Sequence, residues 1–124
     1  MHMTTVDNWS QTPIVGPSCK ETVEQNVAAA GLADIITVKE GDSTEVGKVW
    51  TRDALCLLFV DADHAQHAVL ADVTAWWPHL QIDGLIAFHD SNSQGVGAAL
   101  KVFEKDYPVR LLGHVGSIRA YIRV

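Results

Sequence analysis

The sequence predicts an α/β fold with a mostly parallel sheet, helices on both of its faces and an antiparallel strand at its C-terminal end. Three observations predict it. Apolar, strand-like runs alternate along the chain with segments of helical periodicity. One of these runs opens the segment Leu55–His64 and stops on two acids and a histidine, as expected of a strand buried on both faces of a parallel sheet. The last two strand-like segments are separated only by a short glycine-containing loop, which predicts a hairpin.

The first half of the chain is predicted to contain two strands and two helices. Ser18 and Glu21 have the spacing of a capping box, in which each side chain satisfies a free amide at a helix start, and Gly31 suits the position after the helix. β-Branched residues predict the second strand. The expected elements are a strand end at 4–7, a loop at 11–17, a helix from 18 to 30, a strand at 35–38, a turn at 41–43 and a short helix at about 44–49.

The second half repeats the alternation and then ends in two strands. Val69, Leu70 and Val73 fall on one helical face, and Pro78 limits the extension of that helix. A second amphipathic helix has the same kind of apolar face. After the opening strand, the expected elements are a helix at about 65–77, a turn at 81–84, a strand at 84–91, a helix at 93–106 and strands at 109–113 and 117–124.

Size and composition exclude several classes of protein. The 124 residues predict a single domain over 1–124, and a net charge of −6 without a Lys/Arg cluster argues against a nucleic-acid surface. No apolar run approaches the ~20 residues that span a bilayer, and the N-terminus lacks the pattern of a signal peptide. Only Cys19 and Cys56 are present, so a disulfide framework is not expected and a reducing cytoplasm is the simplest location.

Acids and histidines follow two of the predicted strands. Asp61, Asp63 and His64 come after the first, and His89 and Asp90 after the second. Open α/β sheets bind ligands outside the carboxyl ends of their strands, so these residues predict a ligand site. A structural alternative is that one acid caps the next helix. Capping accounts for one acid but not for the whole group.

Together these residues resemble the class I S-adenosylmethionine-dependent methyltransferases, particularly the small-molecule O-methyltransferase-like group. In that family, segments similar to those ending at His64 and Asp90 close the fourth and fifth strands. The resemblance implies a Rossmann-like three-layer sandwich. The segments that carry it are Val6–Asp7, Gly41–Ser43, Leu57–His64, Trp76–Pro78 and Gly84–Asp90.

One family feature has no counterpart before Asp7. The family's first strand and its acid-x-Gly-x-Gly loop should precede this residue, so the resemblance begins at the second strand and implies a domain truncated at its N-terminus. In the family that strand lies between the second and the fourth. Without it, those two strands must pair directly or another chain must cover their edges, since exposed edges invite association. A homodimer is therefore expected.

The resemblance also implies roles for individual residues. Asp7 would bind the ribose hydroxyls of S-adenosylmethionine, and Gly41, Asp42 and Ser43 would lie at its adenine. Asp61 and Asp90 match the carboxylates that hold a divalent cation such as Mg²⁺ in the metal-dependent members.

The proton-transfer step has one implied candidate. His64 falls near the position of a lysine base in that subgroup, and a histidine can serve as a general base near neutral pH. Asp61 would line the reaction site beside it. Ser91 stands where an asparagine often completes the cation site.

The implied function is methyl transfer from S-adenosylmethionine to an oxygen or nitrogen of a small molecule, by in-line displacement. An alternative is a non-catalytic, truncated methyltransferase-fold protein that serves as a self-associating or partner-binding module. The chain being a fragment of a longer gene product is a third possibility.

Overall fold

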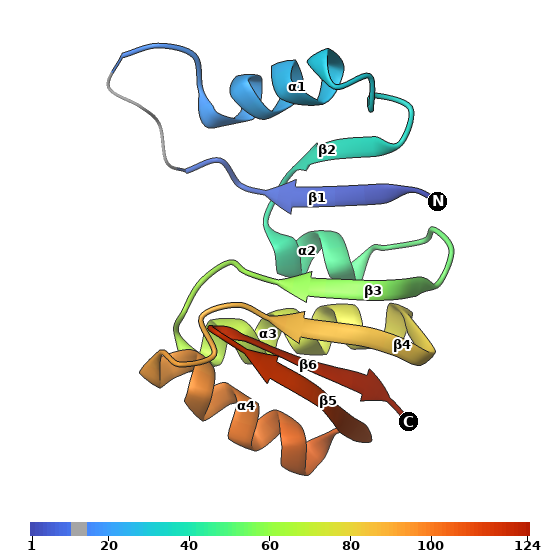
Figure 1. The fold of residues 1–124 in the computed structure, drawn as a ribbon, viewed down its shortest axis with the longest axis vertical. Helices are drawn as coiled ribbons and strands as arrows, with labels where there is room; N and C mark the ends of the chain where they lie inside the picture. Colours follow the sequence, from blue (N-terminus) through green and yellow to red (C-terminus); the bar gives the residue numbers. More distant parts are fainter. Residues whose placement is uncertain (11–14) are drawn as a thin grey trace. The chain divides into compact units, whose positions relative to one another are not determined.

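The structure is a computed structural model that describes residues 1–10 and 15–124 (Figure 1). Its internal contacts group into two compact units, unit 1 (Met1–Val46) and unit 2 (Gly47–Val124), and each is described by itself. The loop expected at 11–17 lies partly outside the described residues. The organisation of 1–124 as one domain stays a prediction.

Unit 1 is built on a parallel pair of strands. β1 and β2 pair directly, with Asp7 opposite Glu40 at their carboxyl ends, and α1 packs against β2. The elements of this unit are β1 (Met3–Asp7), α1 (Cys19–Ala29), β2 (Ile36–Glu40) and the first residues of α2 (Ser43–Lys48).

The predicted capping box is present at the start of α1. The Ser18 hydroxyl accepts a hydrogen bond from the Glu21 amide at 3.1 Å, and the Ser18 amide donates to Glu21 Oε2 at 2.8 Å. Gly31 follows the helix with a φ of +70°, a left-handed conformation that glycine adopts without steric cost. Both predicted ends of this helix are therefore confirmed.

Unit 2 contains a four-stranded mixed sheet in the order β3-β4-β6-β5. β3 and β4 are parallel, whereas β6 runs antiparallel to both of its neighbours. The predicted C-terminal hairpin and antiparallel strand are therefore confirmed. The elements of this unit, after the last residues of α2, are β3 (Leu55–Val60), α3 (Gln66–Trp76), a 3₁₀ turn (Trp77–His79), β4 (Leu80–Phe88), α4 (Gln94–Asp106), β5 (Val109–Val115) and β6 (Ile118–Arg123).

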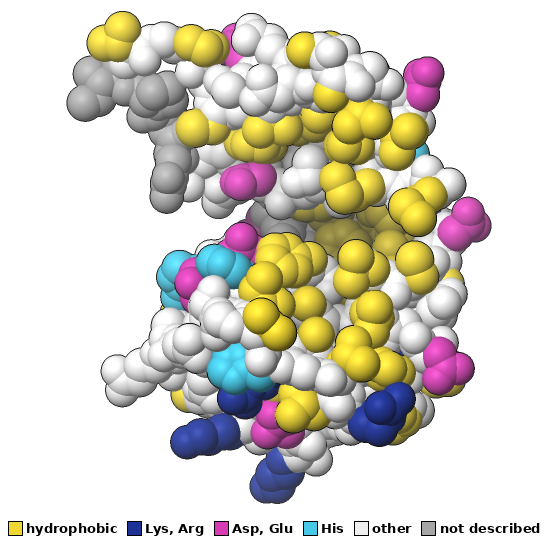
Figure 2. Space-filling view, in the orientation of Figure 1, with side chains coloured by type: hydrophobic (Ala, Val, Ile, Leu, Met, Phe, Trp, Pro, Cys, Tyr) yellow, Lys and Arg dark blue, Asp and Glu magenta, His cyan; other side chains and the backbone are white. Residues whose placement is uncertain are grey.

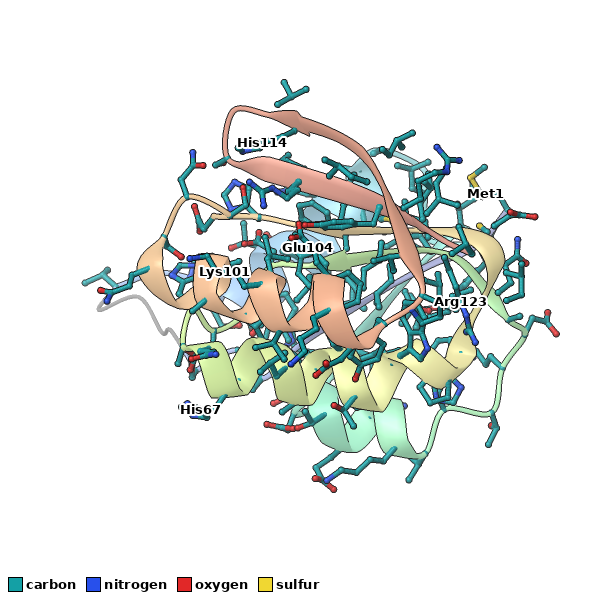
Figure 3. The ribbon with its side chains drawn as sticks, turned by 90° about the horizontal axis from the view of Figure 1, so that it is seen from below. Met1, His67, Lys101, Glu104, His114 and Arg123 are labelled. Carbon is teal, nitrogen blue, oxygen red and sulfur yellow. The ribbon has the colours of Figure 1, made fainter. Side chains whose placement is uncertain are left out.

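The core of unit 2 lies between its sheet and two helices. α3 and α4 lie on the same side of the strands (Figure 3), and their apolar residues join those of the sheet in one buried cluster. Phe103 of α4 contacts the rings of Phe88 and Tyr121, with centroids 5.1 and 5.3 Å away. The Tyr121 hydroxyl donates to Glu104 Oε1 at 2.6 Å, and burial together with this contact raises the pKa of Tyr121.

The other face of this sheet is partly exposed. Side chains alternate along a strand, so Leu58 and Val60 point to the helices while Leu57 and Phe59 point away from them. Leu57 is 56% exposed and Phe59 is 51% exposed. Figure 2 shows hydrophobic side chains gathered over the strands of unit 2 on this face. The expectation that this strand is buried on both faces is therefore wrong, because both helices of unit 2 cover the same face.

The turn expected at 81–84 lies inside β4, which begins at Leu80. Leu55 pairs with Leu80 whereas Leu57 pairs with Leu85, so the longer β4 segment bulges between these pairs. Asp83 has a φ of +62° within the bulge. The turn-like sequence therefore marks an irregularity within a strand. Among the described residues, no helix is long and apolar enough to cross a membrane.

Candidate functional site

The parallel pairing of β3 and β4 brings their carboxyl ends to the same edge of the sheet. Val60 lies opposite Phe88, and the His89 amide donates to the Val60 carbonyl at 3.0 Å. Asp61 and His89 therefore leave the sheet side by side, each directly after its strand, and Asp90 follows His89.

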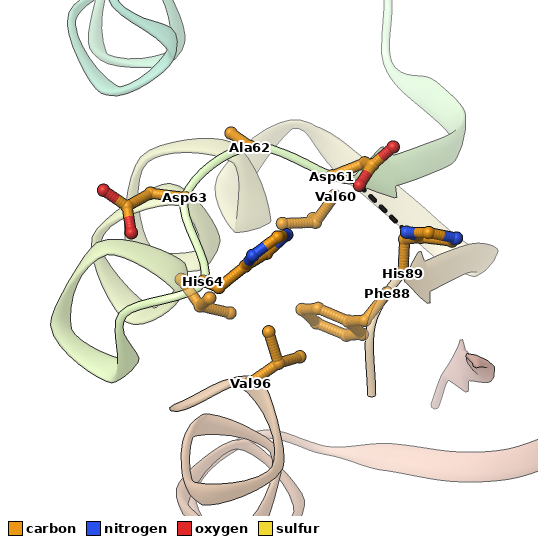
Figure 4. Close-up of a pocket in the computed structure, with 9 residues that line it drawn as sticks. Val60, Asp61, Ala62, Asp63, His64, Phe88, His89 and Val96 are labelled. Carbon is orange, nitrogen blue, oxygen red and sulfur yellow. Dashed lines mark ion pairs between the residues drawn. The ribbon is translucent and has the colours of Figure 1, made fainter. Parts of the chain in front are cut away.

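Two imidazoles and two carboxylates meet at this edge. His89 Nδ1 lies 3.2 Å from Asp61 Oδ1 and 3.1 Å from Asp90 Oδ2, and Figure 4 marks the first of these contacts. His64 Nε2 lies 2.8 Å from the same Asp90 oxygen. The structure thus brings together Asp61, His64, His89 and Asp90, which the sequence singled out, and places His89 Nδ1 near both acids.

The backbone around this group is held tightly. Asp90 has a φ of +51°, a left-handed conformation that aspartate tolerates better than most residues. Its carbonyl accepts a hydrogen bond from the Ser93 amide at 2.8 Å, just before α4 begins. A Cβ at Gly95 would lie 2.0 Å from the His64 carbonyl oxygen, so α4 approaches the loop that carries His64 as closely as glycine allows.

A hairpin residue lies at the other nitrogen of His89. Ser117, between β5 and β6, places its Oγ 3.3 Å from His89 Nε2, and its carbonyl accepts hydrogen bonds from the Ser91 amide and hydroxyl at 2.9 Å each. Sequence reasoning missed Ser117, because a serine after a turn glycine carries no functional signal and lies 28 residues from His89.

Asp63 has a local role. Its Oδ1 accepts a hydrogen bond from the Ala65 amide at 2.8 Å, just before α3 begins, and its carboxylate points away from Asp61 and His89 (Figure 4). Asp63 therefore closes a local turn before α3 and does not cap the helix, because α3 has no side-chain hydrogen bond at its N-cap, Ala65. The capping alternative accounts neither for this acid nor for the group around His89.

The hollow beside the group is small. Even with the open solvent at its mouth included, its empty volume is about 180 Å³, below the roughly 300–1,000 Å³ typical of pockets for organic ligands. It is lined by residues 60–64, Val69, 88–89 and Val96 (Figure 4). In unit 2 alone, this space suits an ion or one reacting group better than a whole nucleoside.

In unit 1, Asp7 and Gly41 lie together at the carboxyl ends of β1 and β2. The Gly41 amide donates to the Asp7 carbonyl at 3.0 Å, and Asp7 Oδ1 accepts from the Trp9 amide at 2.8 Å. Gly41 has a φ of +159°, and a Cβ there would lie 2.9 Å from Val46 Cγ2. This close approach explains why a glycine occupies the turn.

Asp42 and Ser43 lie at the start of α2. Asp42 Oδ1 accepts hydrogen bonds from the Glu45 amide, at 3.1 Å, and from the Thr44 hydroxyl, and Ser43 is the first residue of the helix. Asp42 therefore also has a local structural role. Beside Asp7, Lys20 Nζ lies 2.8 Å from Glu40 Oε2, and the hydrogen bond with Glu40 raises the pKa of Lys20.

Three solved structures share the fold at low sequence identity. The O-methyltransferase NovP matches with a TM-score of 0.79 and 14% identity over 99% of this chain and 60% of its own. CalS11, a TDP-rhamnose 3′-O-methyltransferase of calicheamicin biosynthesis, has a TM-score of 0.71 and 17% identity over 98% of this chain and 58% of its own. An O-methyltransferase from Bacillus cereus in complex with SAH has a TM-score of 0.71 and 17% identity over 98% of this chain and 63% of its own.

These likenesses show a Rossmann-like α/β fold, and the chain spans only 58–63% of the length of these three proteins. No curated protein sequence matches the chain. A family model described as a methyltransferase domain matches residues 1–91, which is 91 of the 124 residues. The protein therefore belongs to the methyltransferase domain family.

Proposed function

We propose that the protein transfers a methyl group from S-adenosylmethionine to an oxygen or nitrogen of a small molecule. The observation that carries this proposal is the contact of Asp61, His64, His89 and Asp90 at the carboxyl ends of β3 and β4. Packing alone does not require two acids and two imidazoles from separate segments to meet at a partly exposed edge. Family membership supplies the reaction class.

The proposed nucleoside contacts are in unit 1. Asp7 would accept hydrogen bonds from the ribose hydroxyls, and Gly41, Asp42 and Ser43 would lie along the adenine. The parallel pairing of β1 and β2 and the bond between Gly41 and Asp7 support this, because they hold both segments at one edge. A hydrogen bond to a charged carboxylate contributes about 1.5–3 kcal/mol.

His64 is the proposed general base. With Asp90 Oδ2 2.8 Å from its Nε2, its Nδ1 would accept the proton of the acceptor group. Asp90 would orient the ring and stabilise the imidazolium that forms, as a carboxylate does for a catalytic histidine in other enzymes. Asp61 would line the same site.

A divalent cation such as Mg²⁺ is a further part of the proposal, held by Asp61 and Asp90. The donor set fits a cation, because ligand atoms of Asp61, His64 and Asp90 all lie within 4.8 Å of one another. When bound, the cation would polarise the acceptor hydroxyl and favour its deprotonation. His89 Nδ1 supports a ligand here as well, since it is buried and has no hydrogen-bond partner.

We also propose that the protein is a cytoplasmic homodimer. β3 pairs only with β4 among the described residues, and Leu57 and Phe59 are more than half exposed. Such an edge and face favour association. A self-associating module without catalysis would expose the same edge, but the match to the methyltransferase domain does not favour that alternative. Light scattering that shows a stable monomer would contradict the dimer, and free Cys19 and Cys56 fit a reducing compartment.

Calorimetric titration with S-adenosylmethionine and S-adenosylhomocysteine tests the proposed activity at its first step. We expect binding, weakened about 10–100-fold by Asp7→Asn through the loss of charge-assisted hydrogen bonds. Asp83→Asn is the matched control, because Asp83 is an exposed acid in the amino-terminal half of β4, whereas the candidate site lies after its carboxyl end. The absence of heat and of a thermal shift at millimolar ligand would remove the proposed activity.

A further inference from the structure

We infer that His89 Nδ1 is a third ligand of the proposed cation, so that the site selects a transition-metal dication over Mg²⁺. This inference rests on the proposed function for placing a cation at Asp61 and Asp90. Its test measures metal binding and needs no methyl transfer, so the inference about His89 and the proposed methyltransferase activity can fail separately.

The geometry around His89 carries the argument. Its Nδ1 lies 3.2 Å from Asp61 Oδ1 and 3.1 Å from Asp90 Oδ2. Nitrogen and carboxylate ligands bind Zn²⁺ at about 2.1 Å, so two of them lie about 3.4 Å apart at the tetrahedral angle and about 3.0 Å apart at a right angle. The two observed separations fall within this interval.

His89 Nδ1 is also short of a partner. The atom is buried and makes no hydrogen bond of acceptable geometry, although two carboxylates lie near it. A buried polar atom without a partner costs free energy. A shared ion would satisfy the nitrogen and both carboxylates together.

The second ring nitrogen of His89, Nε2, has a hydrogen-bond partner, as is usual for a metal-bound histidine. Ser117 Oγ lies 3.3 Å from His89 Nε2, and Ser117 is held by the two hydrogen bonds from Ser91 to its carbonyl. Ligating histidines usually donate their second ring N–H to a protein acceptor, which fixes the tautomer and the ring orientation. Ser117 is in place to accept that hydrogen bond.

His64 is a weaker candidate for the same role. Its side chain is 57% exposed, against 36% for His89, and its Nε2 lies at hydrogen-bonding distance, 2.8 Å, from Asp90. This leaves His64 for proton transfer and His89 for the ion.

Replacing an oxygen ligand by imidazole changes which metals bind. Imidazole suits Zn²⁺, Co²⁺ and related ions, whereas carboxylate and water suit Mg²⁺. Three protein ligands also leave coordination positions for water or substrate. The structure therefore assigns to this site an open, mixed nitrogen and oxygen set.

Titration of the untagged, chelator-treated protein with Co²⁺, followed by visible absorption and calorimetry, tests the inference. We expect Co²⁺ to bind at least about tenfold more tightly than Mg²⁺. His89→Ala should weaken Co²⁺ binding at least about 100-fold and Ser117→Ala about tenfold, given that outer partners of metal ligands contribute roughly 10–100-fold. His64→Ala should weaken it less than His89→Ala does, because His64 contacts only the ligand Asp90, and the exposed control His67→Ala should change it less than about threefold.

His89→Asn provides a second test on a side chain of similar reach. Its amide oxygen can replace the ring nitrogen, so the preference for Co²⁺ over Mg²⁺ should fall towards unity while the protein stays folded by circular dichroism. Equal affinities for the two metals in the natural protein, or a larger loss from His64→Ala than from His89→Ala, would overturn the inference.

Discussion

The two faces of the unit 2 sheet differ in burial although both are apolar. On the face that α3 and α4 cover, Ile86, Phe88 and Tyr121 are at most 1% exposed. On the opposite face, Leu57 and Phe59 remain more than half exposed.

This difference shows that apolar composition predicts which faces of a sheet favour burial. It does not predict whether helices of the same unit cover them. Leu57 aligns with Leu85 and Ile122, and Phe59 with Ala87 and Ala120, so three strands contribute to the open face. A contiguous apolar surface of this kind favours association. We therefore expect substitutions on the two faces to differ in their effect on stability.

The largest expected difference in stability is between alanine substitutions at two phenylalanines, one on each face of the sheet. Phe88→Ala should lower the free energy of unfolding by about 3–5 kcal/mol, because it opens a cavity among the rings of Phe103 and Tyr121. Phe59→Ala should cost less than about 1 kcal/mol in the monomer, since its ring is already half exposed. Guanidinium unfolding followed by circular dichroism, at protein concentrations where light scattering shows a monomer, measures both. Similar losses under these conditions would contradict the exposure of Phe59.

Alanine substitutions at the two glycines of α4 should have intermediate effects on the stability of unit 2. Gly95→Ala should destabilise unit 2 by about 1–3 kcal/mol, because its Cβ would lie 2.0 Å from the His64 carbonyl. Gly97→Ala should stabilise it by up to about 1 kcal/mol, since its nearest neighbour would be Ser91 O at 3.4 Å and alanine is the better helix former. Thermal melts compare them, and a stable Gly95→Ala variant would contradict the close contact.

The smallest expected effect concerns the Tyr121 hydroxyl and pH. Burial and the contact with Glu104 raise the pKa of Tyr121, so the unfolded chain loses this proton first. Its stabilising contribution is complete below about pH 10 and declines as the pH rises towards the folded-state pKa. Relative to Tyr121→Phe, the natural protein should lose about 1 kcal/mol of unfolding free energy between about pH 9 and about pH 11. If the unfolding free energies of the natural protein and of Tyr121→Phe changed with pH in the same way, the hydroxyl of Tyr121 would not be buried.

Local sequence signals predicted much of this fold. The capping box at Ser18 and Glu21, the terminal hairpin and the strands before Asp61 and Asp90 depend on neighbouring residues, and the structure contains each of them. The bulge in β4 did not follow from the sequence, because a glycine in a turn-like segment is equally consistent with a loop.

The candidate site was only partly predictable for a similar reason. Asp61, His64 and Asp90 follow strands and could be grouped from the sheet alone. The approach of Ser117 to His89 depends on β6 pairing between β4 and β5, a long-range contact that no local pattern encodes. Which face of β3 stays open depends on where α3 and α4 pack, and periodicity does not specify that.

The proposed methyl transfer requires that the strand ends bind the methyl donor and its reaction partner. Heteronuclear NMR spectra of the labelled protein, recorded during titration with S-adenosylhomocysteine, test it most directly. We expect the amide signals of Gly41, Asp42 and Ser43 to move, together with those of Asp61 and the residues just after it. Spectra that stay unchanged at millimolar ligand, or that change only at residues far from every strand end, would contradict the claim.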